Sequence, residues 1–276
     1  MSQPTLPALP TFWEFPAPAE WSRIDFISDL HLAPDMPLTF AAWEAYMRAT
    51  PADAVIILGD LFDVWVGDDS RHHGFEARCT AVLAQAASRH RVAFMIGNRD
   101  FLIGTEMLND CGVMALPDPT VLQAFDRRVL LAHGDALCLS DTEYQRYRTL
   151  VRSPQWQAAG LALPLEVRRQ AAAKMRHASE QRQANGMLPA DAADIDGAAA
   201  VAWMHQAATP VLVHGHTHQP GSEPMAPGYV RHVLTDWDLD HSPERRRAEV
   251  LRLTRNGFAR LSLAQAVQTT QDLPTP

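Results

Sequence analysis

Five short polar clusters recur along this chain, and each of them follows directly on an apolar run. They lie at residues 29–31, 59–63, 97–100, 133–135 and 214–218 and read D-L-H, G-D-L-F-D, G-N-R-D, H-G-D and H-G-H-T-H. Carboxylate, amide and imidazole groups form a ligand set that suits Mn, Fe or Zn rather than Cu(I) or an iron–sulfur cluster. Five such clusters in order predict a paired-metal centre, the usual device for displacement at phosphorus.

The apolar runs before the clusters have the length and composition of strands buried on both faces. These runs are Arg23–Ser28, Ala54–Leu58, Arg91–Ile96, Arg128–Ala132 and Pro210–Val213. Helix-like stretches separate several of them, at Leu38–Ala49, Phe75–Ala87 and Asp141–Val151. The alternation predicts an α/β core. Ligands of open α/β sheets gather beyond the carboxyl ends of the strands, where all five clusters lie.

The ends of the chain and its last third complete the expected domain plan. Further strands are predicted at Tyr229–Leu234, Ala248–Thr254 and Phe258–Leu263, with Asn256-Gly257 as a hairpin signal between the last two. Residues 1–20 are rich in proline and are expected to form an irregular extension, and residues 266–276 a flexible tail. Residues 21–265 are expected to form one domain, since 276 residues at 47% hydrophobic content can fill a single large core.

One segment, at about residues 148–208, breaks the alternation because it contains no strand candidate. Leu165–Ala184 follows Pro164 and is predicted to be a long helix, and Asp194–Ala207 a second one. A helical insertion between two of the ligand clusters is expected to cover the site as a cap, and such segments often carry substrate specificity.

Composition excludes several classes of protein. A net charge of −8 argues against a nucleic-acid binder, although an anionic substrate is admissible where bound cations reverse the local field. The three cysteines form no C-x-x-C pair, which indicates a reducing compartment without a disulfide framework. The first residues lack the pattern of a signal peptide, and no run reaches the roughly 18 apolar residues of a spanning helix. A cytosolic protein is therefore expected.

Each cluster taken alone has a simpler interpretation. Asp29 would be a capping residue beside a surface histidine, His31. Asp60 and Asn98 would be residues of Asx turns, and a single histidine such as His133 is more often structural than a metal ligand. The alternating histidines at 214, 216 and 218 have no comparable structural explanation, so the five clusters together favour the metal site.

Other catalytic devices are not supported by the sequence. It contains neither a G-x-S-x-G elbow nor a G-x-x-x-x-G-K phosphate loop. Cys138 lacks the electropositive surroundings of a reactive thiolate. The nucleophile is therefore expected to be water activated by the two metal ions.

Taken in order, D-x-H, G-D-x-x-D, G-N-x-D, H-G-D and G-H-T-H-x-P resemble the calcineurin-like metallophosphoesterase superfamily. The runs at 29–32, 59–62, 65–69, 97–102 and 133–138 are similar to members that cleave UDP-2,3-diacylglucosamine in lipid A biosynthesis of Gram-negative bacteria. The match extends from about Ile24 to about Leu263. It implies a β-sandwich core flanked by helices, with a helical cap insertion. It also implies water attack at the α-phosphorus, giving UMP and 2,3-diacylglucosamine 1-phosphate (lipid X).

The resemblance also implies the site residues, two Mn²⁺ ions per subunit, and peripheral association with the cytoplasmic face of the inner membrane. The first ion would be held by Asp29, His31, Asp60 and His216. The second would share Asp60 and add Asn98, His133 and His214. Substrate contacts would come from Asn98, Arg99, Asp141, Ser179, Gln183 and His214, of which Asn98, Arg99 and His214 are also the implied catalytic residues.

This chain departs from the family pattern at a few positions. Gly186 stands where the family has a lysine in the cap, Gln219 stands where it usually has arginine, and the proline-rich extension is additional. Many superfamily members have a histidine at the position of Arg99, where it protonates an alkoxide leaving group. Arginine cannot act as an acid near pH 7 and suits bidentate phosphate contact instead. Because a phosphate monoester needs no such acid to leave, Arg99 favours pyrophosphate cleavage.

Two other functions remain open, a metallophosphoesterase acting on a soluble nucleotide or dinucleotide, and a non-catalytic metal-binding scaffold. The cap adds a further hypothesis. The apolar segment Val151–Leu165 is expected to receive acyl chains, while the helix face with Arg176, Ser179 and Gln183 meets the sugar and phosphates. An ordinary amphipathic helix packed on the core is the alternative.

Overall fold

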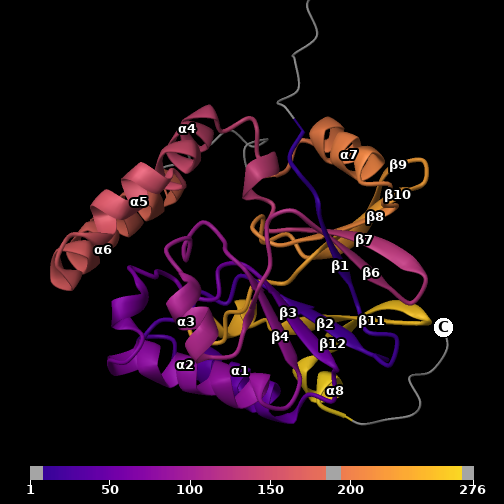
Figure 1. The fold of residues 1–276 in the computed structure, drawn as a ribbon, viewed down its shortest axis with the longest axis horizontal. Coiled ribbons are helices and arrows are strands. Elements are labelled where there is room, and N and C mark those ends of the chain that lie inside the picture. Colours follow the sequence, from indigo (N-terminus) through magenta and orange to yellow (C-terminus); the bar gives the residue numbers. More distant parts are fainter. Residues whose placement is uncertain (1–8, 185–193, 269–276) are drawn as a thin grey trace, which may run out of the picture.

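Two β-sheets stack face to face, and helices cover their outer surfaces (Figure 1). The computed structural model describes residues 9–184 and 194–268, and of residues 176–184 and 245 the backbone alone. Within these ranges, two six-stranded sheets have the orders β12-β11-β2-β3-β4-β5 and β1-β6-β7-β8-β10-β9. This arrangement confirms the predicted β-sandwich core flanked by helices.

The described strands form the two sheets, and eight of them lie close to predicted positions. In the first sheet they are β2 (Ile24–Ile27), β3 (Ala54–Leu58), β4 (Arg91–Met95), β5 (Met114–Ala115), β11 (Glu249–Thr254) and β12 (Gly257–Ser262). In the second sheet they are β1 (Trp13–Pro16), β6 (Thr120–Ala124), β7 (Arg127–Ala132), β8 (Val211–His214), β9 (Gly221–Ala226) and β10 (Tyr229–Val233). The expected hairpin joins β11 to β12, where Thr254 pairs with Gly257.

The central strand β3 is apolar throughout because both of its faces are covered. Ile56 of β3 belongs to the apolar cluster between the sheets, together with Leu131 of β7. Its neighbour Ile57 points the other way, into the cluster that contains Trp43 and Leu83 of the outer helices. Helices α1 (Pro37–Ala49), α2 (Gly74–Ala87), α3 (Thr105–Asp110) and α8 (Leu263–Ala266) cover the first sheet. Continuous apolar runs are the expected signature of such strands.

In the described residues between β7 and β8 there are four α-helices, α4 (Thr142–Val151), α5 (Pro154–Leu161), α6 (Leu165–Ala184) and α7 (Gly197–Gln206). The predicted insertion at about 148–208 is therefore helical in its described part. Its C-terminal boundary differs from the prediction, because Trp203 and Met204 of α7 pack on the second sheet. Only α4–α6 project from the sandwich, as Figure 1 shows, and these helices are called the cap below.

The predicted irregular extension is wrong for one segment, because Trp13–Pro16 forms β1 and pairs in parallel with β6. β1 is an edge strand, where a proline such as Pro16 is tolerated, so the proline-rich composition concealed it. β5, β6, β9, α3, α5 and α8 were also not predicted. Short 3₁₀ helices occupy Asp68–Ser70, Asp135–Leu137 and Pro243–Arg245. None of the described helices combines the length and apolar character that a membrane span requires.

Candidate metal centre

The polar clusters follow strands that run in parallel, three in the first sheet and two in the second. β2, β3 and β4 are parallel neighbours, as are β7 and β8. The loop after each strand therefore leaves the same end of its sheet. These loops contact one another directly, since the backbone N–H of Asp29 donates to Gly59 O at 3.1 Å and that of Gly215 donates to His133 O at 2.9 Å.

Backbone geometry at these loops is unusual for residues other than glycine. Among the described residues, eight non-glycine residues have positive φ, and five of them belong to the polar clusters: Asp29 (54°), His31 (47°), Asp60 (52°), His216 (67°) and His218 (53°). Non-glycine residues rarely adopt this region, and strain of this kind gathers at functional sites. Gly59 cannot be replaced, because at φ 88° a Cβ would lie 2.5 Å from His133 Nδ1.

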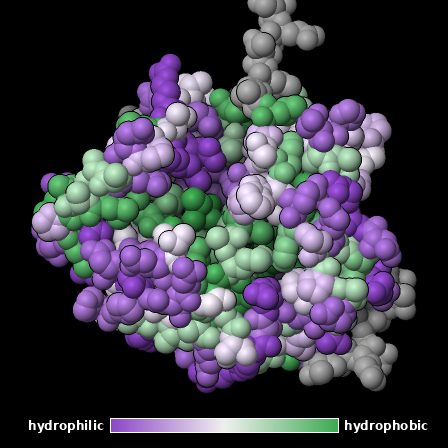
Figure 2. Space-filling view, viewed as in Figure 1, coloured by the Kyte–Doolittle hydropathy of each residue, from purple (hydrophilic) through white to green (hydrophobic). Residues whose placement is uncertain are grey.

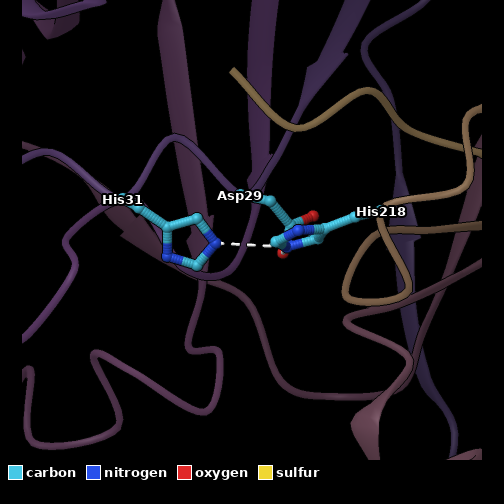
Figure 3. Close-up of side chains that lie close together, drawn as sticks. All are labelled: Asp29, His31 and His218. Atoms are coloured by element: carbon cyan, nitrogen blue, oxygen red, sulfur yellow. Dashed lines mark hydrogen bonds and ion pairs between the residues drawn. The ribbon is translucent and has the colours of Figure 1, made fainter. Parts of the chain in front are cut away.

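A first group consists of Asp29, His31 and His218, whose candidate ligand atoms all lie within 4.8 Å of one another. The Nε2 atoms of the two imidazoles face each other at 3.2 Å. His218 Nε2 lies 3.6 Å from Asp29 Oδ1. Figure 3 shows the His31 ring pointing toward His218, with the Asp29 carboxylate beside it. Three ligand atoms from two distant segments thus converge on one small volume.

A second group surrounds Asn98. The Oδ1 atom of Asn98 lies 2.9 Å from His133 Nε2 and 2.8 Å from His216 Nδ1. His133 Nε2 is also 3.7 Å from Asp60 Oδ1. Asp29, Asp60 and His133 again place their ligand atoms within 4.8 Å of one another. Asp29 therefore belongs to both groups, and the two carboxylates lie between the two pairs of histidines.

The histidines of the last cluster differ from the expected pattern by one step. His216 was expected beside Asp29 and His31, and His214 beside Asn98 and His133, but His218 and His216 occupy these places. His214 is the last residue of β8 and is fully buried, with Nδ1 directed at Gly215 O at 2.8 Å. Alternation predicts a shared face only in extended backbone, and the left-handed conformations at 216 and 218 redirect both rings.

Neighbouring groups hold these side chains in place. His133 Nδ1 donates to Leu58 O at 2.8 Å, which turns Nε2 toward Asn98 and Asp60. Asp29 Oδ2 accepts from Ser28 Oγ at 2.5 Å and from the backbone N–H of His216 at 2.9 Å. Such surrounding hydrogen bonds orient the ligands of most protein metal sites.

Two carboxylates that support the site were missed at the sequence level. Asp100 is fully buried and accepts from the backbone N–H groups of Gly97 at 2.7 Å and Leu61 at 2.8 Å, which joins the loops of Asn98 and Asp60. Asp236 Oδ2 lies 3.6 Å from His218 Nδ1 and accepts from Arg247 at 2.6 Å. Asp100 stands in the G-N-R-D cluster and was visible there, whereas Asp236 follows β10 with no motif to mark it.

Burial dominates the electrostatics of the site. It lowers the pKa of His31 to about 3 and that of His216 to about 3, which keeps both imidazoles neutral, as metal ligands must be. Burial, with Asp100 and Asp29 nearby, raises the pKa of Asp60 to about 7. Burial opposes protonation of His133, but the carboxylates of Asp60 and Asp135 raise its pKa to about 9. Positive charge from bound cations would stabilise the ionised form of Asp60, which burial disfavours.

The expected substrate residues lie in different surroundings. The backbone N–H of Arg99 donates to Asp60 Oδ1 at 2.8 Å. Burial is the main cause of the lowered pKa of His31, and the nearby guanidinium of Arg99 lowers it further. Asp141 caps α4 by accepting from the backbone N–H of Tyr144 at 2.9 Å. The side chains of Ser179 and Gln183 lie outside the described residues, as does Gly186.

The donors present fit a pair of divalent cations. Among the described side chains, Asp29 Oδ1 is buried without a hydrogen-bond partner, which is costly unless a further group satisfies it. Carboxylate, amide and neutral imidazole groups suit Mn²⁺, Fe²⁺ or Zn²⁺. The two groups of donors share Asp29, and this arrangement allows two ions to be held side by side.

Comparison with known proteins gives independent evidence on the family of this chain. Residues 22–220 match the family model described as calcineurin-like phosphoesterase. A Ralstonia nicotianae protein named UDP-2,3-diacylglucosamine hydrolase is 44% identical over 233 residues, which cover 80% of this chain and 85% of that protein. A Chromobacterium violaceum protein of the same name is 40% identical over 222 residues, 78% of this chain and 90% of its own.

Proposed function

The chain belongs to the calcineurin-like phosphoesterase family, and we propose that it hydrolyses UDP-2,3-diacylglucosamine at its pyrophosphate bond. The products are UMP and 2,3-diacylglucosamine 1-phosphate, an intermediate of lipid A biosynthesis. The observation that carries this proposal is that the two ligand groups share Asp29 and that the second contains Asp60, whose Oδ1 atom accepts from the backbone N–H of Arg99 at 2.8 Å.

The two groups and the family resemblance together support an assignment of the residues that would hold the two ions, with Asp60 as the shared carboxylate taken from the resemblance. We assign the first ion to Asp29, His31, Asp60 and His218, and the second to Asp60, Asn98, His133 and His216. Mn²⁺ is the proposed metal, since it accepts both carboxylate and imidazole ligands. When bound, such a pair activates water and offsets negative charge on the phosphoryl oxygens.

Arg99 is the residue that we propose stabilises negative charge on the pyrophosphate as the leaving group departs. Its guanidinium can contact two phosphate oxygens at once and stabilises the negative charge that builds up during attack at the α-phosphorus. No general acid is required, because the departing lipid 1-phosphate is a weak base. We further propose that the substrate is contacted, beside Arg99, by Asn98, Asp141, Ser179 and Gln183. His214 is fully buried, and we propose that it packs beneath the ligands without contacting the substrate.

The cap supplies an apolar surface for the acyl chains. Leu150, Leu161, Leu163, Val167 and Met175 are all exposed by more than a third of their surface. Figure 2 shows apolar side chains gathered over α5 and α6 and continuing toward the middle of this face. We propose that this surface receives the acyl chains and brings the protein to the cytoplasmic face of the inner membrane as a peripheral protein.

Product analysis tests the proposal. The protein is incubated with Mn²⁺ and either UDP-2,3-diacylglucosamine or the same UDP-sugar without acyl chains, and products are identified by mass spectrometry. UMP and diacylated sugar phosphate from the acylated substrate alone are expected. Equal cleavage of both compounds, or preference for a soluble nucleotide, would reassign the substrate. Absence of cleavage with two bound ions would indicate a metal-binding scaffold.

A further inference from the structure

The first helix of the cap is bonded to the loops that carry the second ligand group. Asp135, two residues after His133, is fully buried. Its Oδ2 atom accepts from Tyr144 Oη at 2.7 Å, Arg148 Nε at 2.8 Å and Arg152 Nη2 at 3.2 Å. Tyr144 and Arg148 lie one turn apart on α4, and Arg152 is the capping residue directly after the last residue of this helix. Asp135 is therefore the point at which α4 is fixed to the core.

The same side chains of α4 reach two of the proposed ligands. The ring of Tyr144 stacks on the imidazole of His216, with centroids 6.0 Å apart and planes inclined by 28°. Arg152 Nη2 also donates to Gly97 O at 3.0 Å, directly before Asn98. His216 and Asn98 are the two residues whose ligand atoms lie 2.8 Å apart in the second group.

Charge keeps α4 in this position. Asp118 lies beside Asp135, with Arg148 Nη2 at 3.7 Å from its Oδ2 atom. Two buried carboxylates thus face two arginines of one helix. Removal of one partner of a buried ion pair is strongly destabilising, because it leaves an uncompensated charge. Displacement of α4 would leave the charges of both Asp118 and Asp135 uncompensated, so the position of α4 against the core is favoured.

We propose that α4 positions the ligands of the second metal ion, with Tyr144 and Arg152 acting as positioning residues through Asp135. The inference rests on the proposed paired-metal function. None of these side chains is itself a proposed ligand. Tyr144 limits rotation of the His216 ring, and Arg152 holds the backbone from which Asn98 extends. Loss of such supporting contacts typically lowers metal affinity about 10- to 100-fold.

A second anchor of the cap provides a matched control. Arg168 of α6 donates to Asp69 and to the carbonyl oxygen of Val66, at the other end of the cap. It also donates to Leu163 O at 2.9 Å. None of the partners of Arg168 is a proposed metal ligand, so Arg168→Gln loosens the cap without touching the site. If attachment of the cap were all that mattered, variants at both anchors would behave alike.

The experiment measures Mn²⁺ binding to the metal-free protein for the parent, Tyr144→Phe, Tyr144→Leu, Arg152→Gln and Arg168→Gln. Titration calorimetry gives the affinities of the two ions, and electron paramagnetic resonance separates a coupled Mn pair from a single Mn ion. Circular dichroism confirms folding of each variant. Tyr144→Phe keeps the ring and removes one hydrogen bond, so it reports on the site even if the larger changes prevent folding.

For Tyr144→Leu and Arg152→Gln, we expect parent-like affinity for the first ion and about 10- to 100-fold weaker binding of the second. The coupled signal should then give way to a single-ion signal at limiting Mn²⁺. Tyr144→Phe should show a smaller loss, and Arg168→Gln none. Parent-like second-ion binding in all variants overturns the inference, as does an equal loss in Arg168→Gln. A parent that binds one ion overturns the paired-metal proposal as well.

Discussion

At the residue scale, the proposed ligands occupy conformations that their own side chains do not favour. Asp29, Asp60 and His218 each have φ between 52° and 54°. A residue held in a sparsely populated region costs on the order of 1–3 kcal/mol. The surrounding loops impose these conformations, for example through the hydrogen bond from the N–H of Asp29 to Gly59 O. The surrounding loops therefore fix the backbone conformation of these proposed ligands.

Asp60 is the carboxylate that we expect both ions to share. Asp60→Ala should abolish turnover and reduce bound metal while the protein stays folded, because this buried side chain lies among other carboxylates and its loss relieves their repulsion. Elemental analysis and thermal unfolding check both parts. Asp35→Ala, at an exposed position, is the control and should retain full activity and metal. Full occupancy together with near-normal activity in Asp60→Ala would remove Asp60 from the site.

Arg99 is expected to act on the substrate and not on the metals. Arg99→Ala should lower kcat/KM by about two orders of magnitude or more, the range for loss of a charge-assisted contact in the transition state. Arg99→Lys should be a poor substitute, since a lysine cannot make the bidentate contact. Bound metal should stay at the parent level in both variants. Phosphorus-31 kinetics give the rates, and an unchanged rate for Arg99→Ala would refute this role.

Asp236 is expected to orient His218 from the side opposite the site. Asp236→Asn removes the negative charge that faces His218 Nδ1 and should weaken binding of the first ion about 10- to 100-fold. Asp238→Asn is the matched control, because the carboxylate of Asp238 is bonded to His241 in the same loop. Mn²⁺ titration of the two variants separates them. Equal affinities would show that His218 needs no such support.

At the element scale, the sequence predicted the strands better than the direction in which residues leave them. The runs before the clusters were recognised because burial on both faces requires continuous apolar residues. The histidines of the last cluster lie one alternate position away from the expected places, because the left-handed backbone at His216 and His218 ends the extended geometry that places alternate residues on one face. β1 was missed because it is a proline-rich edge strand, and β6 because it is short and mixes polar with apolar residues, so neither shows a clear hydrophobic periodicity.

The cap helices give the prediction that belongs to this scale. Leu161 and Leu163 are 43% and 47% exposed on the cap, and each methylene that an acyl chain buries there should contribute about 0.8 kcal/mol. Leu161→Glu or Leu163→Glu should therefore weaken binding of the diacylated substrate and leave metal content intact. Leu38→Glu makes the same change at 48% exposure on α1 and is the control. Unchanged affinity for long and short acyl chains in both cap variants would place the acyl site elsewhere.

At the scale of the whole molecule, stacking of the two sheets explains why distant motifs meet. β2, β3 and β4 bring Asp29, Asp60 and Asn98 to one end of the first sheet, and β7 and β8 bring the histidines to the same end of the second. The order of motifs predicted that these residues form one site, because ligands gather beyond the carboxyl ends of parallel strands. Their division between two ions depends on loop conformations that no strand pattern encodes.

The most direct test of the central claim is the fate of solvent oxygen in the reaction. UDP-2,3-diacylglucosamine is cleaved in ¹⁸O-labelled water with Mn²⁺, and both products are weighed by mass spectrometry. Attack of water at the α-phosphorus predicts one ¹⁸O atom in UMP and none in 2,3-diacylglucosamine 1-phosphate. Label in the lipid product, or products other than these two, would contradict the account.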